Sequence, residues 1–266
     1  MTSFSTDRRG RIAIVTMTGP AMGYEFFAEL PRVFGDLDAD PGVRAIVLGG
    51  SAGNFSFGLD LKEVAPLFAT VAGPGAGAAE RVKLLAQVKE WQAALTVVAS
   101  CRTPVISAIE GWCVGGGIDL VAATDIRLAS ADAKFSVRET RVGIVADLGS
   151  LQRLVGIVGD GHLRELVLTG GDIDAVRAER IGLVNTVYPD GPSLMDAALA
   201  LAAQIAENSP LVVRGVKDVL DAERAPRVEA GLRYVAAWNS AFLPSKDLGE
   251  AFTAFTERRK PEFSGE

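Results

Sequence analysis

The fold is decided by residues 104–120, which read PVISAIEGWCVGGGIDL. The apolar run 105–109 predicts a short buried strand, the glycine-rich segment 111–117 a turn, and residues 118–123 the start of a helix. Backbone N–H groups at a helix start lack intrahelical partners, and the helix dipole is positive there, so this arrangement favours negative charge. Tight turns and close helix packing also need glycine, and the motif alone is therefore weak evidence for a ligand site.

The segments that precede this stretch alternate between strand and helix patterns. Residues 11–18 and 43–48 predict strands, and residues 24–37 and 81–100 carry apolar residues at helical spacing. The glycine- and alanine-rich segment 71–79 predicts a mobile surface loop, with a lid over a ligand site as the alternative. Strands that alternate with helices indicate an α/β fold.

Helical patterns dominate the segments that follow. Two more strands are predicted at 126–129 and 134–137 and one at 183–187, and helices at 151–158, 162–168, 175–181, 194–207, 211–222, 228–242 and 247–259. We therefore predict a core over residues 1–190 and a helical region over residues 191–266, with the hinge at 189–193.

Composition excludes several classes of function. The 266 residues are 48% hydrophobic, which is enough to bury a large core, and the net charge of −6 disfavours nucleic acid and anionic membranes as partners. A single histidine, His162, excludes a zinc site built on several histidines, and we predict a surface or capping role for it. Cys101 and Cys113 indicate a reducing compartment, and no apolar leader is present, so we predict a cytoplasmic location.

Three acids, Asp119, Glu139 and Asp147, lie within 29 residues of one another, two of them in apolar surroundings. Acids rarely occupy such positions unless they are paired, hydrogen-bonded or reactive. In an apolar cleft they raise one another's pKa, so that one can stay protonated near neutral pH and act as a general acid. Each has a structural alternative: Asp119 and Asp147 could cap helices, and Glu139 could pair with a nearby arginine.

A second glycine-containing loop, residues 54–62, reads NFSFGLDLK and follows a predicted strand. If the N–H groups of Leu59 and Gly116 face each other, they form a two-donor oxyanion hole for a carbonyl substrate. Such a pair stabilises an enolate by about 2.7–4 kcal/mol for each donor.

These motifs together resemble the crotonase (enoyl-CoA hydratase/isomerase) superfamily over nearly the full chain. The matching segments are 55–62, 104–108 with Gly111, 115–120, 125–127, 135–139, 152–154 and the C-terminal pattern 255–263. The resemblance implies a crotonase fold, in which a spiral core of ββα units is followed by a C-terminal helical trimerisation region. It also implies a homotrimer or a dimer of trimers.

The acids distinguish subgroups of this superfamily. Enoyl-CoA hydratases carry glutamates at the positions of Asp119 and Glu139, whereas this chain has a shorter acid at the first position and adds Asp147. The trio, with residues 143–154 and 234–239, resembles the Δ3,5-Δ2,4-dienoyl-CoA isomerases. The resemblance implies that Glu139 is the base at C2 of a 3,5-dienoyl-CoA, that Asp147 is the acid at C6, and that Asp119 orients the site.

The same resemblance implies where coenzyme A is bound. The implied contacts are Lys62, Gly58, Phe255, Arg259 and Lys260, and the CoA thioester is the substrate, so no metal or redox cofactor is implied. Two alternatives remain. One is an enoyl-CoA hydratase that uses Glu139 and Asp119 on water, and the other is a non-catalytic homologue that binds acyl-CoA or RNA.

Overall fold

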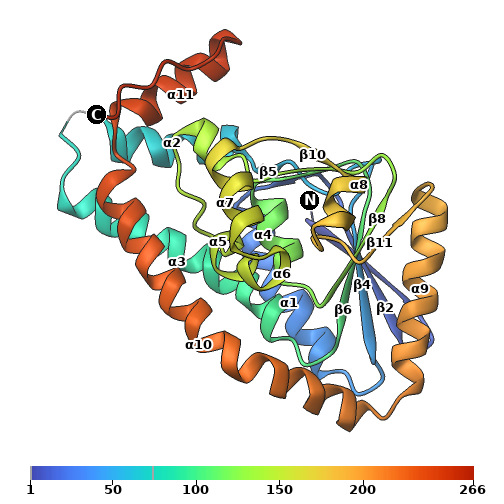
Figure 1. Cartoon of the computed structure of the whole chain (residues 1–266). Helices are drawn as coiled ribbons and strands as arrows, with labels where there is room; N and C mark the ends of the chain where they lie inside the picture. Colours follow the sequence, from blue (N-terminus) through green and yellow to red (C-terminus); the bar gives the residue numbers. More distant parts are fainter. Residues whose placement is uncertain (1, 74) are drawn as a thin grey trace.

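A six-stranded sheet forms the centre of the computed structural model, which describes residues 2–73 and 75–266 (Figure 1). Its strands, in spatial order, are β1 (Phe4–Arg9), β2 (Ile12–Met17), β4 (Ala45–Gly49), β6 (Val105–Ile109), β8 (Ile126–Ser130) and β11 (Thr186–Tyr188). β1 is antiparallel to β2, and the other neighbours are parallel. Two small sheets pair β10 (Ile173–Asp174), β9 (Lys134–Ser136) and β7 (Trp112–Val114), and β3 (Ala21–Met22) with β5 (Gly58–Leu59).

Helices cover both faces of the large sheet. They are α1 (Tyr24–Ala39), α2 (Leu61–Ala72), α3 (Ala78–Ser100), α4 (Gly116–Ala122), α5 (Ser150–Arg153), α6 (Val155–Val158), α7 (Asp160–Thr169), α8 (Ala175–Arg180), α9 (Gly191–Glu207), α10 (Pro210–Phe242) and α11 (Lys246–Glu257), with a 3₁₀ turn η1 (Glu139–Val142). The chain is thus the mixed α/β protein that the sequence predicts.

Side-chain alternation along the strands creates two separate cores. In β4, Ala45 and Val47 pack with α9 on one face, whereas Ile46 and Leu48 join the larger core beneath α1, α3 and α4 on the other. Both faces are buried, as expected of strands in a parallel sheet. The region at 191–266 therefore contributes α9 to the packing of the sheet, and the division of the chain at residue 190 stays a prediction.

Several elements differ from the sequence prediction. The polar strand β1 and the helix α2 were not predicted, because only Phe4 of β1 is buried and Pro66 lies inside α2. The predicted loop at 71–79 is shorter than expected, since Val71 is buried at the end of α2 and α3 begins at Ala78. Residue 74 of that segment lies outside the described residues.

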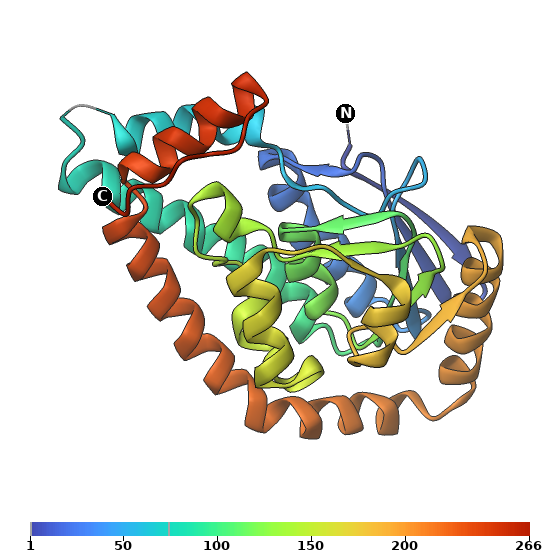
Figure 2. The same ribbon diagram turned by 45° about the horizontal axis from the view of Figure 1, so that its top comes forward.

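The two helices predicted at 211–222 and 228–242 form one helix, α10, of 33 residues with Pro226 inside it. Proline lacks an N–H group and crowds the preceding turn, so it bends a helix that packing holds together. The bend is visible where α10 changes direction in Figure 2. The prediction of a break was wrong, because α10 continues through Pro226 and packs against α3 and α5.

The C-terminal helix α11 folds back over the N-terminal half of the chain, beside α2 (Figures 1 and 2). The rings of Phe252 and Phe68 lie 5.7 Å apart between these two helices, and Leu248 is buried. The backbone of α11 also approaches Gly143 at the end of η1. Among the described residues, no helix is long and apolar enough to cross a membrane.

Candidate active site

The three acids line one cavity of about 120 Å³. Its walls come from the loop before α2, the triple-glycine turn, η1 and the turn before α5. The lining residues are Phe57, Gly58, Leu59, Leu61, Val114, Gly115, Gly116, Asp119, Arg138, Glu139, Val142, Ile144, Asp147 and Leu148. The lining is mostly apolar, so charges within the cavity interact strongly.

Asp119 lies on α4, which the triple glycine opens, and its side chain is almost fully buried. The Ser150 N–H at the start of α5 donates a hydrogen bond to Asp119 Oδ1. Burial raises the pKa of Asp119 to about 6, while the Ser150 hydrogen bond and the positive charge of Arg153 act in the opposite direction. Asp119 therefore caps α5 rather than its own helix, and the Ser150 hydrogen bond and Arg153 favour its ionised form.

Glu139 begins η1, and a Cβ atom added to Gly115 would lie 3.4 Å from its Oε1, so the carboxyl group lies against the triple-glycine turn. Its other oxygen, Oε2, is buried and has no hydrogen-bond partner. Burial first, and then the charges of Asp119 and Asp147, raise the pKa of Glu139 to about 8. The structural alternative was an ion pair of Glu139 with Arg138, Arg141 or Arg153, and none of these pairs is present among the described residues; Arg138 pairs with Asp172 at 2.7 Å instead.

Asp147 is held by a side-chain amide from a distant helix. Asn239 on α10 donates from Nδ2 to Asp147 Oδ2 at 2.6 Å and to the Val145 carbonyl at 2.8 Å. Gln92 on α3 donates to the Asp147 carbonyl at 2.6 Å. Burial raises the pKa of Asp147 to about 7, the Asn239 hydrogen bond lowers it, and the charge of Asp119 raises it. The side chain therefore bonds Asn239 and does not cap α5, which begins at Ser150 after Gly149.

Sequence reasoning missed the roles of Asn239 and Gln92. These residues lie 92 and 55 positions from Asp147, so nothing local indicates that they meet. The only signal was the resemblance of residues 234–239 to the isomerase subgroup.

The predicted oxyanion donors, Leu59 and Gly116, lie opposite each other. Gly58 has a φ of +81°, and a Cβ there would lie 2.8 Å from the Val114 carbonyl oxygen and 3.0 Å from the Gly116 nitrogen. A Cβ on Gly116 would lie 3.7 Å from the Leu59 nitrogen. Only glycine satisfies both the left-handed backbone and the close approach at position 58. The Gly116 N–H, at the first position of α4, has no carbonyl partner within its helix.

The predicted coenzyme A contacts divide into two groups. Gly58 lines the cavity, whereas Lys62, Phe255, Arg259 and Lys260 are exposed and lie outside its lining. Arg259 already pairs with Glu250 and Glu257. The proximity of α2 to α11 brings the two segments to the same side of the molecule, and the roles of these four residues stay predictions. In the described part of the chain, no cluster of His, Cys, Asp or Glu has an arrangement suited to a metal ion.

The geometry suits proton transfer at two points on one substrate. Two acids with pKa values raised toward neutrality, Glu139 and Asp147, border the same cavity as two backbone donors and a third acid, Asp119. A carbonyl oxygen bound by the donors would place the carbons next to it among these carboxyl groups.

Comparisons with known proteins agree with this chemistry. A family model described as enoyl-CoA hydratase/isomerase matches residues 7–266. The chain is 44% identical to a mitochondrial Delta(3,5)-Delta(2,4)-dienoyl-CoA isomerase of Dictyostelium discoideum, over 91% of this chain and 83% of that protein. It is 42% identical to a peroxisomal Delta(3,5)-Delta(2,4)-dienoyl-CoA isomerase of Arabidopsis thaliana, over 92% of this chain and 88% of the relative.

Solved structures share the fold over the whole chain. The crystal structure of a carnitinyl-CoA hydratase from Mycobacterium avium superposes with a TM-score of 0.82 at 30% identity, covering 100% of both chains. The crotonase fold predicted from the motifs is thereby confirmed.

The prediction of a cytoplasmic location is contradicted by the relatives, which are named as mitochondrial and peroxisomal proteins. That prediction rested on the lack of an apolar leader and on two cysteines, which are both free and buried in the structure. Reduced cysteines are compatible with any reducing compartment, and the folded core carries no mark of its location. The cytoplasmic assignment is therefore withdrawn.

Proposed function

The chain belongs to the enoyl-CoA hydratase/isomerase family, and we propose that it isomerises 3,5-dienoyl-CoA to 2,4-dienoyl-CoA. One observation carries this proposal: besides Asp119 and Glu139, the cavity holds a third acid, Asp147. A hydrogen bond from Asn239 positions the side chain of Asp147. Addition of water to an enoyl-CoA requires two acids around the water. A shift of two conjugated double bonds requires a base and an acid at separate carbons.

The reaction begins with the thioester oxygen between the Leu59 and Gly116 N–H groups. Glu139 removes a proton from C2, and the electron pair of the C–H bond forms the C1–C2 double bond of a dienolate, whose negative charge lies on the thioester oxygen, where the backbone donors stabilise it. The thioester carbonyl then re-forms, so that the C1–C2 pair becomes the C2–C3 double bond and the C3–C4 pair becomes the C4–C5 double bond. The C5–C6 pair takes a proton from Asp147 at C6. Glu139 ends protonated and Asp147 ionised, and proton exchange with solvent restores the starting state.

The cycle needs Glu139 ionised and Asp147 protonated, so the pair must hold one proton. With pKa values of about 8 and about 7, it holds one proton between about pH 7 and pH 8. The two carboxyl groups interact, so this proton belongs to the pair and is shared between Glu139 and Asp147. The charge of Asp119 raises the pKa of both partners and keeps this window near neutral pH.

The hydratase alternative requires Asp119 and Glu139 to hold a water between them. Asp119 Oδ1 already accepts a hydrogen bond from Ser150, and the side chain is 1% exposed, which leaves it poorly placed to activate water. The alternatives are separated by offering the protein 3,5-dienoyl-CoA and 2-enoyl-CoA and following the absorbance of the conjugated thioester. Formation of the 2,4-diene with little hydration supports the isomerase, whereas hydration without diene conversion identifies the hydratase.

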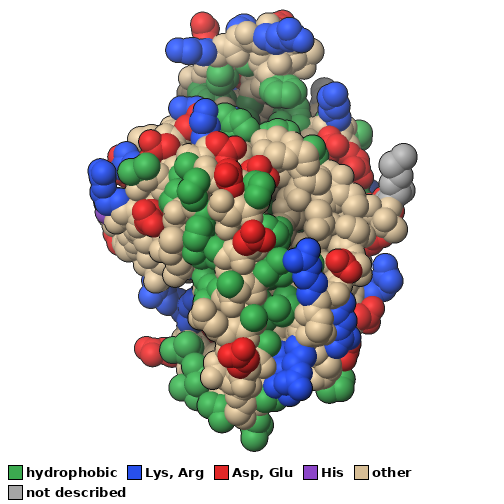
Figure 3. Space-filling model, turned by 90° about the vertical axis from the view of Figure 1, so that its right-hand side faces the viewer, with side chains coloured by type: hydrophobic (Ala, Val, Ile, Leu, Met, Phe, Trp, Pro, Cys, Tyr) green, Lys and Arg blue, Asp and Glu red, His purple; other side chains and the backbone are tan. Residues whose placement is uncertain are grey.

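We also propose that the chain assembles as a homotrimer or a dimer of trimers through its helical C-terminal region. The first half of α10 exposes Leu211, Val216, Val219 and Leu220, which a monomer would leave in water. Figure 3 shows hydrophobic side chains along the α9 side of the molecule and at its lower end. Sedimentation equilibrium should give three or six times the chain mass of 27.9 kDa, and a monomer would contradict this proposal.

A further inference from the structure

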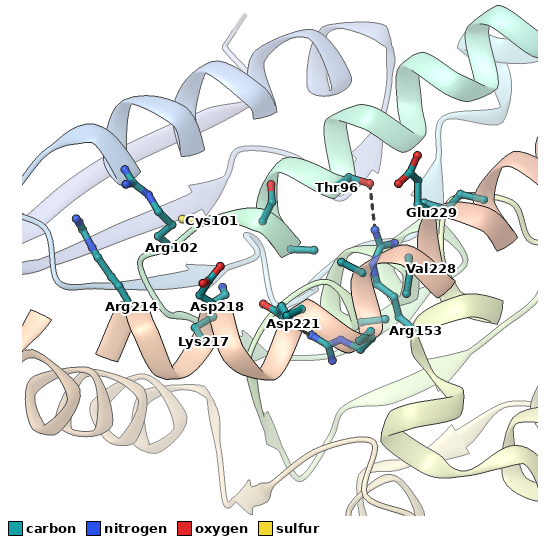
Figure 4. A pocket seen from close by; sticks show the side chains of 17 residues that line it. Thr96, Cys101, Arg102, Arg153, Arg214, Lys217, Asp218, Asp221, Val228 and Glu229 are labelled. Carbon is teal, nitrogen blue, oxygen red and sulfur yellow. Dashed lines mark hydrogen bonds and ion pairs between the residues drawn. The ribbon is translucent and has the colours of Figure 1, made fainter. Parts of the chain in front are cut away.

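A buried arginine lies behind the three acids. Arg153, the last residue of α5, is 3% exposed, and its Nη2 donates to Thr96 Oγ1 on α3 at 3.1 Å. Its Nη1 donates to the Leu148 carbonyl at 3.2 Å. Figure 4 shows the side chain extending from α5 to Thr96. Both of these acceptors are uncharged, so neither of them neutralises the positive charge of the guanidinium group.

The guanidinium group also fixes the turn that carries the acid Asp147. A Cβ atom added to Gly149, where φ is +133°, would lie 1.7 Å from Arg153 Nη1. The arginine therefore packs directly against the backbone of Gly149, between the Leu148 carbonyl that it binds and the Ser150 N–H that binds Asp119. A change in Arg153 would therefore alter the contacts of the turn that carries Asp147 and the Ser150 N–H group.

Apart from Arg153, the titratable groups that lie near Asp119 are acids. Glu139 comes from η1, Asp147 from the turn before α5, and the buried thiol of Cys113 from β7. Arg153 supplies positive charge to Asp119, and its own charge is opposed by Arg224 on α10.

We propose that Arg153 is a positioning residue that holds Asp119 ionised and fixes the turn at residues 147–150. The inference deepens the proposed isomerisation and rests on it for its catalytic meaning. An ionised Asp119 repels a second negative charge, and so it helps Glu139 and Asp147 to retain their shared proton. Loss of the arginine charge favours the protonated form of Asp119, which removes this repulsion and lowers the pH range in which Glu139 and Asp147 share one proton.

The cavity on the other side of Arg153 shows why the Thr96 hydrogen bond matters. This second cavity, of about 330 Å³, lies between α3 and α10 and is lined by both basic and acidic side chains, including Asp221 and Glu229 (Figure 4). Without Thr96 Oγ1, the guanidinium group has space to turn toward these carboxylates and away from Gly149. Thr96 thus belongs to the same positioning unit.

The test is a carboxyl ¹³C NMR titration of Asp119 without substrate, combined with the pH profile of kcat. Arg153→Gln should raise the pKa of Asp119 by on the order of one unit and, because protonated Asp119 no longer raises the pKa of Glu139 and Asp147, move the acidic limb of kcat to lower pH. Arg153→Lys keeps the charge and should restore most of both values. Arg127→Gln is the matched control, because Arg127 is also buried and also binds backbone carbonyls, those of Leu183 and Thr124. It should leave the pKa of Asp119 unchanged.

An unchanged Asp119 pKa in Arg153→Gln would overturn the inference, as would an equal shift in Arg127→Gln. If Arg153→Gln does not fold, Thr96→Val replaces it and should raise the pKa of Asp119 by a smaller amount; no shift in that variant overturns the inference as well. A wild-type protein that is inactive on 3,5-dienoyl-CoA refutes the proposed function instead. The substrate-free titration still decides the role of Arg153 in that case.

Discussion

Replacing the proposed acid Asp147 with asparagine should abolish isomerisation and, above neutral pH, make the fold more stable. The pKa of Asp147 is about 7 in the folded protein and about 3.9 in an unfolded chain, a difference of about three units. The folded state therefore binds the proton more tightly than the unfolded state, and ionisation of Asp147 costs stability as the pH rises from about 4 to about 7. Each unit corresponds to about 1.4 kcal/mol, so the full cost is at most about 4 kcal/mol.

Asparagine removes this cost because it cannot ionise. Its amide oxygen can still accept the hydrogen bond from Asn239 Nδ2, so the packing around residue 147 is retained. The gain in the free energy of unfolding should be near zero at pH 4, grow through pH 5 and 6, and level off above about pH 7. Urea unfolding at a fixed protein concentration, repeated across this pH range, measures the gain.

The matched control is Asp247→Asn. Asp247 is a half-buried acid whose pKa is lowered by hydrogen bonds from the backbone of Ser264 and Gly265, so its ionised form is favoured in the folded state. This variant should show no gain in stability above pH 7. If Asp147→Asn is no more stable than the wild-type protein at pH 8.5, then ionisation of Asp147 does not lower the stability of the fold. The pKa of Asp147 would then not be raised in the folded protein.

Three further predictions concern turnover. The pH profile of kcat/KM should have its maximum between about pH 7 and 8. Asp119→Asn should move both limbs of its residual activity to lower pH, because the charge of Asp119 raises the pKa of Glu139 and of Asp147. Limbs that stay in place would show that the charge of Asp119 does not affect these two acids. Gly58→Ala should lower kcat by roughly 10²–10³ while circular dichroism stays native, since its Cβ would meet the Val114 carbonyl oxygen beside the donors; near-normal kcat would place the oxyanion elsewhere. Lys62→Gln should raise KM severalfold with little change in kcat if the lysine binds only the CoA phosphates, and an unchanged KM would remove it from the CoA site.

The sequence predicted the strands and helices whose buried residues recur at regular spacing along the chain. The strands at 43–48, 105–109 and 126–129 are present because their apolar runs are buried on both faces, and α1 and α3 follow apolar spacing of about 3.6 residues. The missed strand β1 has a polar pattern, since it pairs at the edge of the sheet. The continuity of α10 past Pro226 depends on contacts with α3 and α5, which are absent from any local window.

The residues of the candidate site also fall into two groups: those that the local sequence indicated and those that only the fold brings together. Asp119, Glu139 and Asp147 stood out because acids are unusual beside glycine-rich and apolar segments, and all three border one cavity. Arg153 and Asn239 stood only within segments that resemble the family, and Gln92 gave no signal, because an amide or arginine within a helix is ordinary until the fold brings it to the acids. The compartment could not be predicted from the chain, since free cysteines fit any reducing compartment.

The most direct test follows hydrogen exchange at C2 of 3,5-dienoyl-CoA in D₂O, by NMR, with Asp147→Asn and Glu139→Gln. If the two acids act at opposite ends of the dienolate, Asp147→Asn should incorporate deuterium at C2 without forming the 2,4-diene, because Glu139 still removes and returns a proton. Glu139→Gln should do neither. Normal isomerisation by Asp147→Asn, or C2 exchange that persists in Glu139→Gln, would contradict the assignment of base and acid.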